Sequence, residues 1–218
     1  FKGTHMSRFV EVLARNSREF DGSTMPAILA ELKEVLNAES ARMTMTFPYF
    51  LRKRAPVTGV AALMDYECSF DGSSGPDGED FLLGVKVPVN SLCPCSREIS
   101  SYGAHNQRGY MTLEVRSIRS VEGRPEMVWI EELIEAAESS ASSPVYSLLK
   151  RPDERFVTER SFDNPVFVED MVRNASAALM KDDRIAWFRV TAENHESIHN
   201  HSAYARFEWS RGGRERTE

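Results

Sequence analysis

The order of two hydrophobic periodicities constrains the fold of this chain more than any other feature. Residues 6–20 and 24–40 space their apolar side chains three and four positions apart, which is typical of amphipathic helices. Thr24 suits the N-cap of the second helix, and Pro26 suits its first turn. Residues 41–53 and 57–70 then alternate in the manner of β-strands. The first third is therefore predicted to run helix–helix–strand–strand.

The rest of the chain repeats these elements with one more pair of strands. Strand patterns and two helical patterns follow in the order strand–strand–helix–helix–strand–strand, over residues 81–89, 109–121, 126–140, 164–182, 184–197 and 203–210. Between the two parts, residues 71–80 are rich in Gly, Ser, Pro and Asp, which predicts a loop. We expect an antiparallel α+β structure of two tandem units, residues 1–75 and 76–218. The first unit then lacks two strands, as if the sequence began inside a longer protein.

Composition narrows the class of protein. The chain of 218 residues is 41% hydrophobic, which is enough for a sizeable core. Its net charge of -6 argues against a nucleic-acid binder, and no apolar run approaches the roughly 20 residues of a membrane span. Three cysteines do not form a disulfide framework, so we expect a cytoplasmic protein with free thiols.

One segment, SLCPCSREISSYGAHNQRG at residues 91–109, carries candidate metal ligands. Cys93 and Cys95 flank a proline, and His105 follows in the same polar stretch. Thiolate and imidazole are the ligands that zinc-class ions prefer. The two cysteines alone fit a structural role equally well, and His105 strengthens the metal interpretation. A closed structural site needs a fourth ligand, whereas a catalytic site keeps one position open for water.

A second polar segment, ENHESIHNHSAYA, holds His195, His199 and His201 between the last two predicted strands. The three imidazoles share a face if the segment stays extended, and a turn breaks that arrangement. A solvated hairpin tip is the alternative. We favour a functional role because polar side chains that can orient imidazoles surround the histidines: Asn194, Glu196, Ser197 and Asn200.

Charged residues near these segments are weaker candidates. Glu154 falls in a segment expected to be irregular, and Glu169 falls in a predicted helix beside apolar residues. Both fit ordinary surface positions when judged from the residues alone. Arg97 and Arg108 lie within the cysteine–histidine segment, and guanidinium groups suit phosphate.

Five motifs together resemble type IB GTP cyclohydrolase I. They are KGTHMSRF, LCPCSREISSYGAHNQRG, LLKRPDERFVTE, NPVFVEDMVR and ENHESIHNHSAYA, in this order from Lys2 to about Trp209. Members of that family hydrolyse GTP to 7,8-dihydroneopterin triphosphate and formate, the first step of tetrahydrofolate biosynthesis. The resemblance implies a tunnelling fold and a homotetramer with active sites at subunit interfaces.

The resemblance also implies roles for individual residues. The metal ligands fall on Cys93, His105, Glu154 and His199, and the metal is zinc, manganese or iron. Cys93, His199 and His201 act in catalysis, in which metal-activated water attacks guanine C8. Glu169 holds the guanine ring, and Arg97 and Arg108 are candidates for binding GTP. Cys95 receives no role.

Two other functions fit the same motifs. A nitrile reductase of the tunnelling fold would use its cysteine as a nucleophile together with NADPH. A non-catalytic module would use the cysteines and histidines to hold a closed zinc site. The dense set of Cys, His and Glu residues favours metal-dependent hydrolysis over both.

Overall fold

The computed structural model describes residues 6–16, 23–119 and 125–212. The first four residues of the KGTHMSRF motif lie outside these ranges. Seven antiparallel strands form one sheet in the order β1-β2-β3-β4-β6-β7, and β5 pairs with β3. The strands are β1 (Ala41–Arg54), β2 (Ala61–Gly75), β3 (Gly78–Leu92), β4 (Asn106–Ser117), β5 (Ser143–Pro144), β6 (Ile185–His195) and β7 (Ser202–Ser210).

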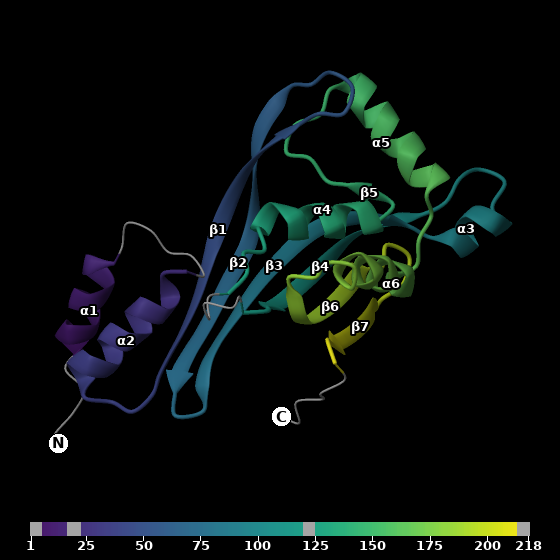
Figure 1. The fold of residues 1–218 in the computed structure, drawn as a ribbon. Coiled ribbons are helices and arrows are strands. Elements are labelled where there is room, and N and C mark those ends of the chain that lie inside the picture. Colours follow the sequence, from purple (N-terminus) through teal and green to yellow (C-terminus); the bar gives the residue numbers. More distant parts are fainter. Residues whose placement is uncertain (1–5, 17–22, 120–124, 213–218) are drawn as a thin grey trace.

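Helices α2 (Met25–Leu36), α4 (Ile130–Ser140) and α6 (Val168–Leu179) pack on one face of this sheet, and α1 (Met6–Arg15) packs on α2 (Figure 1). Two further helices are α3 (Pro94–Ile99), which lies beyond the end of β3, and α5 (Arg151–Asp163), which lies near the turn between β1 and β2. The predicted alternation of helix pairs and strand pairs is confirmed, with α3, β5 and α5 added between the predicted elements. Among the helices in the described ranges, none is both long enough and apolar enough to cross a membrane.

The predicted loop at residues 71–80 is mostly strand. β2 runs to Gly75 and β3 starts at Gly78, so only two residues form the turn. Gly72 serves packing, because a Cβ there would lie 2.5 Å from the Met25 side chain. The division between residues 75 and 76 falls at this hairpin turn, inside a continuous sheet, and it stays a prediction.

The core lies between the sheet and the helices. Alternate residues of the central strands point toward the helices and are fully buried, as with Val85, Val87 and Val89 of β3. Helix α6 buries an apolar face that includes Val168, Met171 and Val172. Trp129 is 57% exposed, whereas Leu133 and Ile134 of α4 are buried. The reason is that Trp129 precedes the helix in an extended conformation.

The segment around Glu154, expected to be irregular, is helix α5. Its start depends on Asp153, which is fully buried and accepts a hydrogen bond from the backbone of Lys150 at 2.9 Å. The same carboxylate accepts hydrogen bonds from the backbone of Val57 and from the backbone and hydroxyl of Thr58, at 2.7–2.9 Å. Burial alone would raise the pKa of Asp153, but these donors hold it well below its usual range. Asp153 thus ties α5 to the turn between β1 and β2, which lie together in Figure 1.

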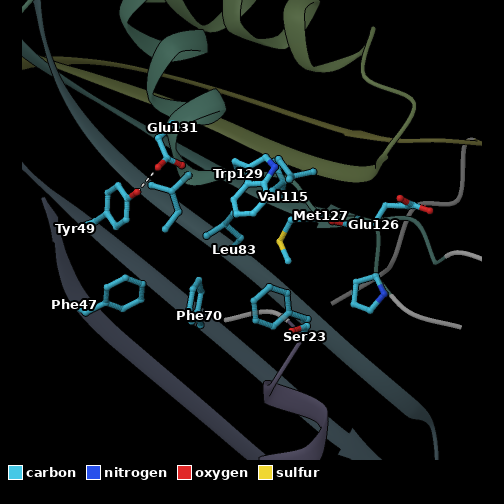
Figure 2. Close-up of a pocket in the computed structure, with 15 residues that line it drawn as sticks. Ser23, Phe47, Tyr49, Phe70, Leu83, Val115, Glu126, Met127, Trp129 and Glu131 are labelled. Atoms are coloured by element: carbon cyan, nitrogen blue, oxygen red, sulfur yellow. Dashed lines mark hydrogen bonds between the residues drawn. The ribbon is translucent and has the colours of Figure 1, made fainter. Parts of the chain in front are cut away.

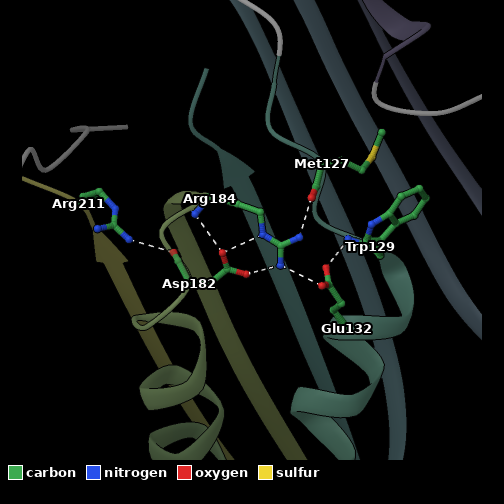
Figure 3. Close-up of polar contacts among 6 residues, drawn as sticks. All are labelled: Met127, Trp129, Glu132, Asp182, Arg184 and Arg211. Carbon is green, nitrogen blue, oxygen red and sulfur yellow. Dashed lines mark hydrogen bonds and ion pairs between the residues drawn. The ribbon is translucent and has the colours of Figure 1, made fainter. Parts of the chain in front are cut away.

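Arg184 joins the turn before β6 to the start of α4 (Figure 3). Its guanidinium donates to both carboxylate oxygens of Asp182, at 2.9 and 2.6 Å, and to Glu132 at 3.0 Å. It also donates to the carbonyl of Met127 at 2.9 Å. Hydrogen bonds from Arg184 lower the pKa of Asp182, against the opposing effect of burial.

We expect Asp182→Asn to reduce stability mainly above about pH 4. A carboxylate with a depressed pKa in the folded state stabilises the protein above its unfolded value of about 3.9. That contribution is lost as the pH falls through the folded pKa. Urea unfolding from neutral to acid pH should show a loss of about 1–2 kcal/mol at pH 7 that shrinks in acid.

Asp183→Asn is the matched control, because the neighbouring Asp183 side chain is 96% exposed. It should change the free energy of unfolding by less than about 0.5 kcal/mol. Equal losses in both variants at every pH would contradict the role assigned to Asp182.

Candidate functional site

Cys93 and His105 lie together where β3 ends and β4 begins. The Cys93 backbone N–H donates to the His105 carbonyl at 3.1 Å. Ser96 links the same two residues, since its N–H donates to the Cys93 Sγ at 3.4 Å and its hydroxyl accepts from the His105 N–H at 3.2 Å. The two motifs CPC and GAHN therefore form one compact unit, as the sequence predicted.

Hydrogen bonds fix the orientation of the His105 ring. Its Nδ1 lies 3.0 Å from Oε1 of Gln107, which is only 7% exposed. An amide oxygen only accepts hydrogen bonds, so the contact places the ring proton on Nδ1 and leaves the Nε2 lone pair free. Metal-binding histidines are commonly held in this way. The sequence analysis did not single out Gln107, although it lies two residues after a candidate ligand.

The second histidine segment approaches the first through Ser197, whose hydroxyl lies 3.3 Å from His105 Nδ1. Residues 196–201 form the turn between β6 and β7, so the three histidines do not share one strand face. His199 and His201 stack instead, with ring centroids 5.2 Å apart, and both are exposed. His195 lies on β6 beside Tyr110, at 5.6 Å between ring centroids.

The predicted carboxylates lie on helices away from this unit. Glu154 is exposed in the first turn of α5. Glu169 is exposed in the first turn of α6 and lines a groove between α6 and β7. Within the described ranges, no three His, Cys, Asp or Glu side chains lie close enough to hold a metal ion. The single chain thus brings together two of the four predicted ligands, Cys93 and His105.

The two predicted arginines lie in different surroundings. Arg97 is half-buried, with its guanidinium carbon 4.7 Å from the centre of the Phe162 ring. Arg108 is exposed and lines a separate hollow of about 410 Å³ with Lys86 and Tyr110. The Lys86 ammonium lies 5.1 Å from the Tyr110 ring centre.

A further cavity, of about 290 Å³, contains none of the predicted site residues (Figure 2). Its walls are mainly apolar, with Phe47 and Phe70 from the sheet and Met127 and Trp129 from the segment before α4. At one end the Tyr49 hydroxyl donates to Glu131. This hydrogen bond, together with burial, raises the pKa of Tyr49 to about 12.

The sequence matches an established family over most of its length. Residues 1–205 match the family described as "Type I GTP cyclohydrolase folE2". A protein named "GTP cyclohydrolase FolE2" from Citrifermentans bemidjiense is 56% identical over 211 residues, which is 97% of this chain and 76% of that protein. A protein of the same name from Methylococcus capsulatus is 56% identical over 208 residues, which is 95% of this chain and 75% of that protein.

Solved structures resemble the fold at much lower identity. A uricase from Arthrobacter globiformis matches 96% of this chain and 77% of its own, with a TM-score of 0.55 and 10% identity. A urate oxidase from Bacillus sp. TB-90 matches 94% of this chain and 78% of its own, with a TM-score of 0.52 and 10% identity. This likeness concerns the fold alone, and it confirms the predicted α+β tunnelling fold.

We expect the three cysteines to differ in reactivity. All three lie in the described part of the chain as free thiols: Cys95 is exposed, Cys93 is half-buried and Cys68 is buried. Burial raises the pKa of Cys68 to about 12, so at about pH 8 this thiol is protonated and unreactive. Iodoacetamide labelling followed by peptide mass spectrometry should modify Cys95 first, Cys93 more slowly and Cys68 hardly at all.

Protein unfolded in urea is the control, and there all three cysteines should react at similar rates. Early labelling of Cys68 in the folded protein would contradict the burial of this side chain in the core.

Proposed function

Because the chain belongs to the type I GTP cyclohydrolase FolE2 family, we propose that it is the type IB enzyme, with an active site built around Cys93 and His105. GTP cyclohydrolase I activity follows from family membership: the enzyme hydrolyses GTP to 7,8-dihydroneopterin triphosphate and formate. The observation that carries the site assignment is the compact Cys93–His105 unit, in which Gln107 leaves His105 Nε2 free. We place this reaction at the start of tetrahydrofolate biosynthesis.

The donor set of this unit fits a divalent ion of the zinc class. Thiolate sulfur and imidazole nitrogen suit zinc and also accept iron, and oxygen ligands widen the choice to manganese. Cys93 and His105 would hold the ion, with Glu154 and His199 as the proposed remaining ligands. When bound, such an ion supplies hydroxide near neutral pH for attack on guanine C8.

His201, which stacks on the proposed ligand His199, is suited to move protons. The turn that carries them reaches His105 through Ser197, at 3.3 Å. Opening the imidazole ring of guanine and releasing formate both require proton transfers, and histidine serves this role near neutral pH. We therefore assign His199 and His201, with Cys93, to catalysis.

Recognition of GTP requires a guanine anchor and cations. The Glu169 carboxylate is exposed at the groove beside β7 and is able to accept hydrogen bonds from guanine N1–H and the 2-amino group. Adenine lacks that pair of donors, so the same contact selects guanine. Arg97 and Arg108 are our candidates for the triphosphate.

Completion of the site by a second copy of the chain explains why these residues are spread over the surface. Large apolar side chains are exposed close to the Cys93–His105 unit: Ile99 at 85%, Tyr102 at 100% and Ile198 at 65%. β1 and β7 lie at the edges of the described sheet, where further strands are able to pair. We propose a homotetramer with active sites between subunits, located in the cytoplasm, where thiols stay reduced.

The deciding experiment is GTP turnover by metal-depleted protein after addition of zinc, manganese or iron. Formate release and a fluorescent neopterin after oxidation are expected. Folded, metal-loaded protein that gives neither product would contradict the proposal. It would then favour a closed zinc module, or an NADPH-dependent reductase if NADPH is consumed with a nitrile.

Cys93→Ala should abolish metal retention and lower kcat/KM by at least about 100-fold, because it removes a metal ligand outright. Loss of a group that only supports a ligand already costs about 10–100-fold. Cys95→Ala is the matched control two residues away. Its metal content and its kcat/KM should both stay within about threefold of the wild-type values. Metal content and formate release measure the two effects. A Cys93→Ala enzyme with normal metal content and turnover would overturn the ligand assignment.

Glu169→Gln should lower kcat/KM for GTP by about 100-fold, because a charged acceptor of two hydrogen bonds is replaced by an amide. The amide also turns a donor toward the guanine donors. Glu135→Gln, at an exposed position on α4, is the control and should behave as wild type. Unchanged turnover in the Glu169 variant would remove this residue from guanine recognition.

A further inference from the structure

A buried polar link lies directly behind Cys93. Ser91 is fully buried and continues the core-facing alternation of β3, where valines occupy the preceding positions. Its hydroxyl accepts a hydrogen bond from the Asn194 side-chain amide at 3.1 Å and donates to the Val166 carbonyl at 3.0 Å. Asn194 is 2% exposed and is the residue before His195 on β6. One hydroxyl therefore connects β3, β6 and Val166, which lies two residues before the start of α6.

The two residues after Ser91 extend these connections. The Leu92 N–H donates to the Ser142 hydroxyl at 2.9 Å, and the Leu92 carbonyl accepts from the Val166 N–H at 3.2 Å. The Cys93 N–H donates to the His105 carbonyl at 3.1 Å. Ser91, Leu92 and Cys93 thus bond to the segments that lead into β4, into α6 with Glu169, and into the turn of residues 196–201, called the histidine turn below.

The geometry around Asn194 is specific to this link. A Cβ at Gly109, its cross-strand neighbour, would lie 2.4 Å from Asn194 Oδ1, so only glycine leaves room for the amide. Among the described residues, Asn194 Oδ1 has no hydrogen-bond partner although it is buried. An unpaired buried carbonyl is costly, and an apolar side chain would avoid that cost. Within the described ranges, the hydrogen bond that the Asn194 amide makes is the one that it donates to Ser91.

We propose that Ser91 and Asn194 are positioning residues for GTP hydrolysis, which set the distance between the metal-binding unit and the guanine anchor. The inference rests on the proposed function. Val166 lies three residues before Glu169, and Ser91 lies two residues before Cys93. The Ser91 hydroxyl is a side-chain contact between these two segments. Ser91 and Asn194 are 0% and 2% exposed, so they act through the residues that they hold and not by direct contact with GTP.

The test compares Ser91→Ala and Asn194→Ala, singly and combined, with Ser74→Ala. Ser74 on β2 is the matched control, because it is 4% exposed and its hydroxyl also links two elements, accepting from the Lys33 ammonium of α2 at 2.8 Å. It pairs with the start of β3, whereas Cys93 follows the end of that strand. Ser91→Ala should lower kcat by about 10–100-fold, the usual effect of removing a group that supports a ligand, while KM changes much less. The double variant should be no worse than Ser91→Ala alone, since the two changes break the same link.

A second readout separates positioning from packing. Zn²⁺ added to metal-free wild type should raise the melting temperature, and this increment measures metal affinity. The increment should shrink in Ser91→Ala and Asn194→Ala and stay unchanged in Ser74→Ala. A purely structural role would lower the melting temperature of metal-free and Zn²⁺-loaded protein equally.

Gly109→Ala reaches the same link without removing any polar atom, because its methyl group displaces the Asn194 amide. It should reproduce the kinetic and melting pattern of Asn194→Ala, and these two variants decide the question if Ser91→Ala does not fold. Wild-type kcat and wild-type Zn²⁺ increments in the folded variants would overturn the proposal. Failure of the wild type to release formate from GTP would instead contradict the proposed function, and the Zn²⁺ increments would still test the link.

Discussion

The hydrogen bonds at the end of β3 hold the candidate site together. Residues Ser91 to Cys93 leave the sheet at the point where β4 begins, β6 ends and α6 starts, and each of them bonds to at least one of these segments. A strand end normally frays, because its backbone groups lose their ladder partners. Here the pairing with β4 continues to Leu92, and on the other side of β3 the Ser142 hydroxyl and the Val166 N–H serve as partners for the Leu92 backbone. The strand end that leads to Cys93 is therefore bonded on both sides.

Two charged residues connect the helices to turns at the ends of the strands. Asp153 binds the β1–β2 turn to α5, and Arg184 binds the turn before β6 to α4. Asp153 accepts four hydrogen bonds, and the Arg184 guanidinium donates four, in each case with both backbone groups and side chains as partners. Charge-assisted hydrogen bonds of this kind are stronger than neutral ones, and they fix loops that carry little apolar area. The helices that bear Glu154 and Glu169 are therefore positioned by polar anchors as much as by core packing.

The candidate site of a single chain is open on the side where the histidine turn and α3 lie. Two predicted ligands meet there, while Glu169, the proposed guanine anchor, lies at the groove beside the edge strand β7. Apolar side chains that are 65–100% exposed surround the opening. A site divided in this way is chemically complete only when other groups approach it, which agrees with the interfacial active sites proposed for the family fold.

The periodicities of the sequence determined the order of helices and strands, because burial of one face imposes a spacing of 3.6 or 2 residues. The motifs around Cys93 and His105 likewise identified one site unit, since the two residues are close along the chain. Helix α5 was missed because its start depends on hydrogen bonds that Asp153 accepts from a turn almost a hundred residues away. The hydrogen bonds of Ser91 to Asn194 and Val166 were missed for the same reason. The partners of a polar residue in a predicted strand cannot be identified until the arrangement of the sheet is known. The positions of helices and strands thus follow from the spacing of apolar residues in the sequence, whereas the pairing of polar side chains depends on tertiary contacts.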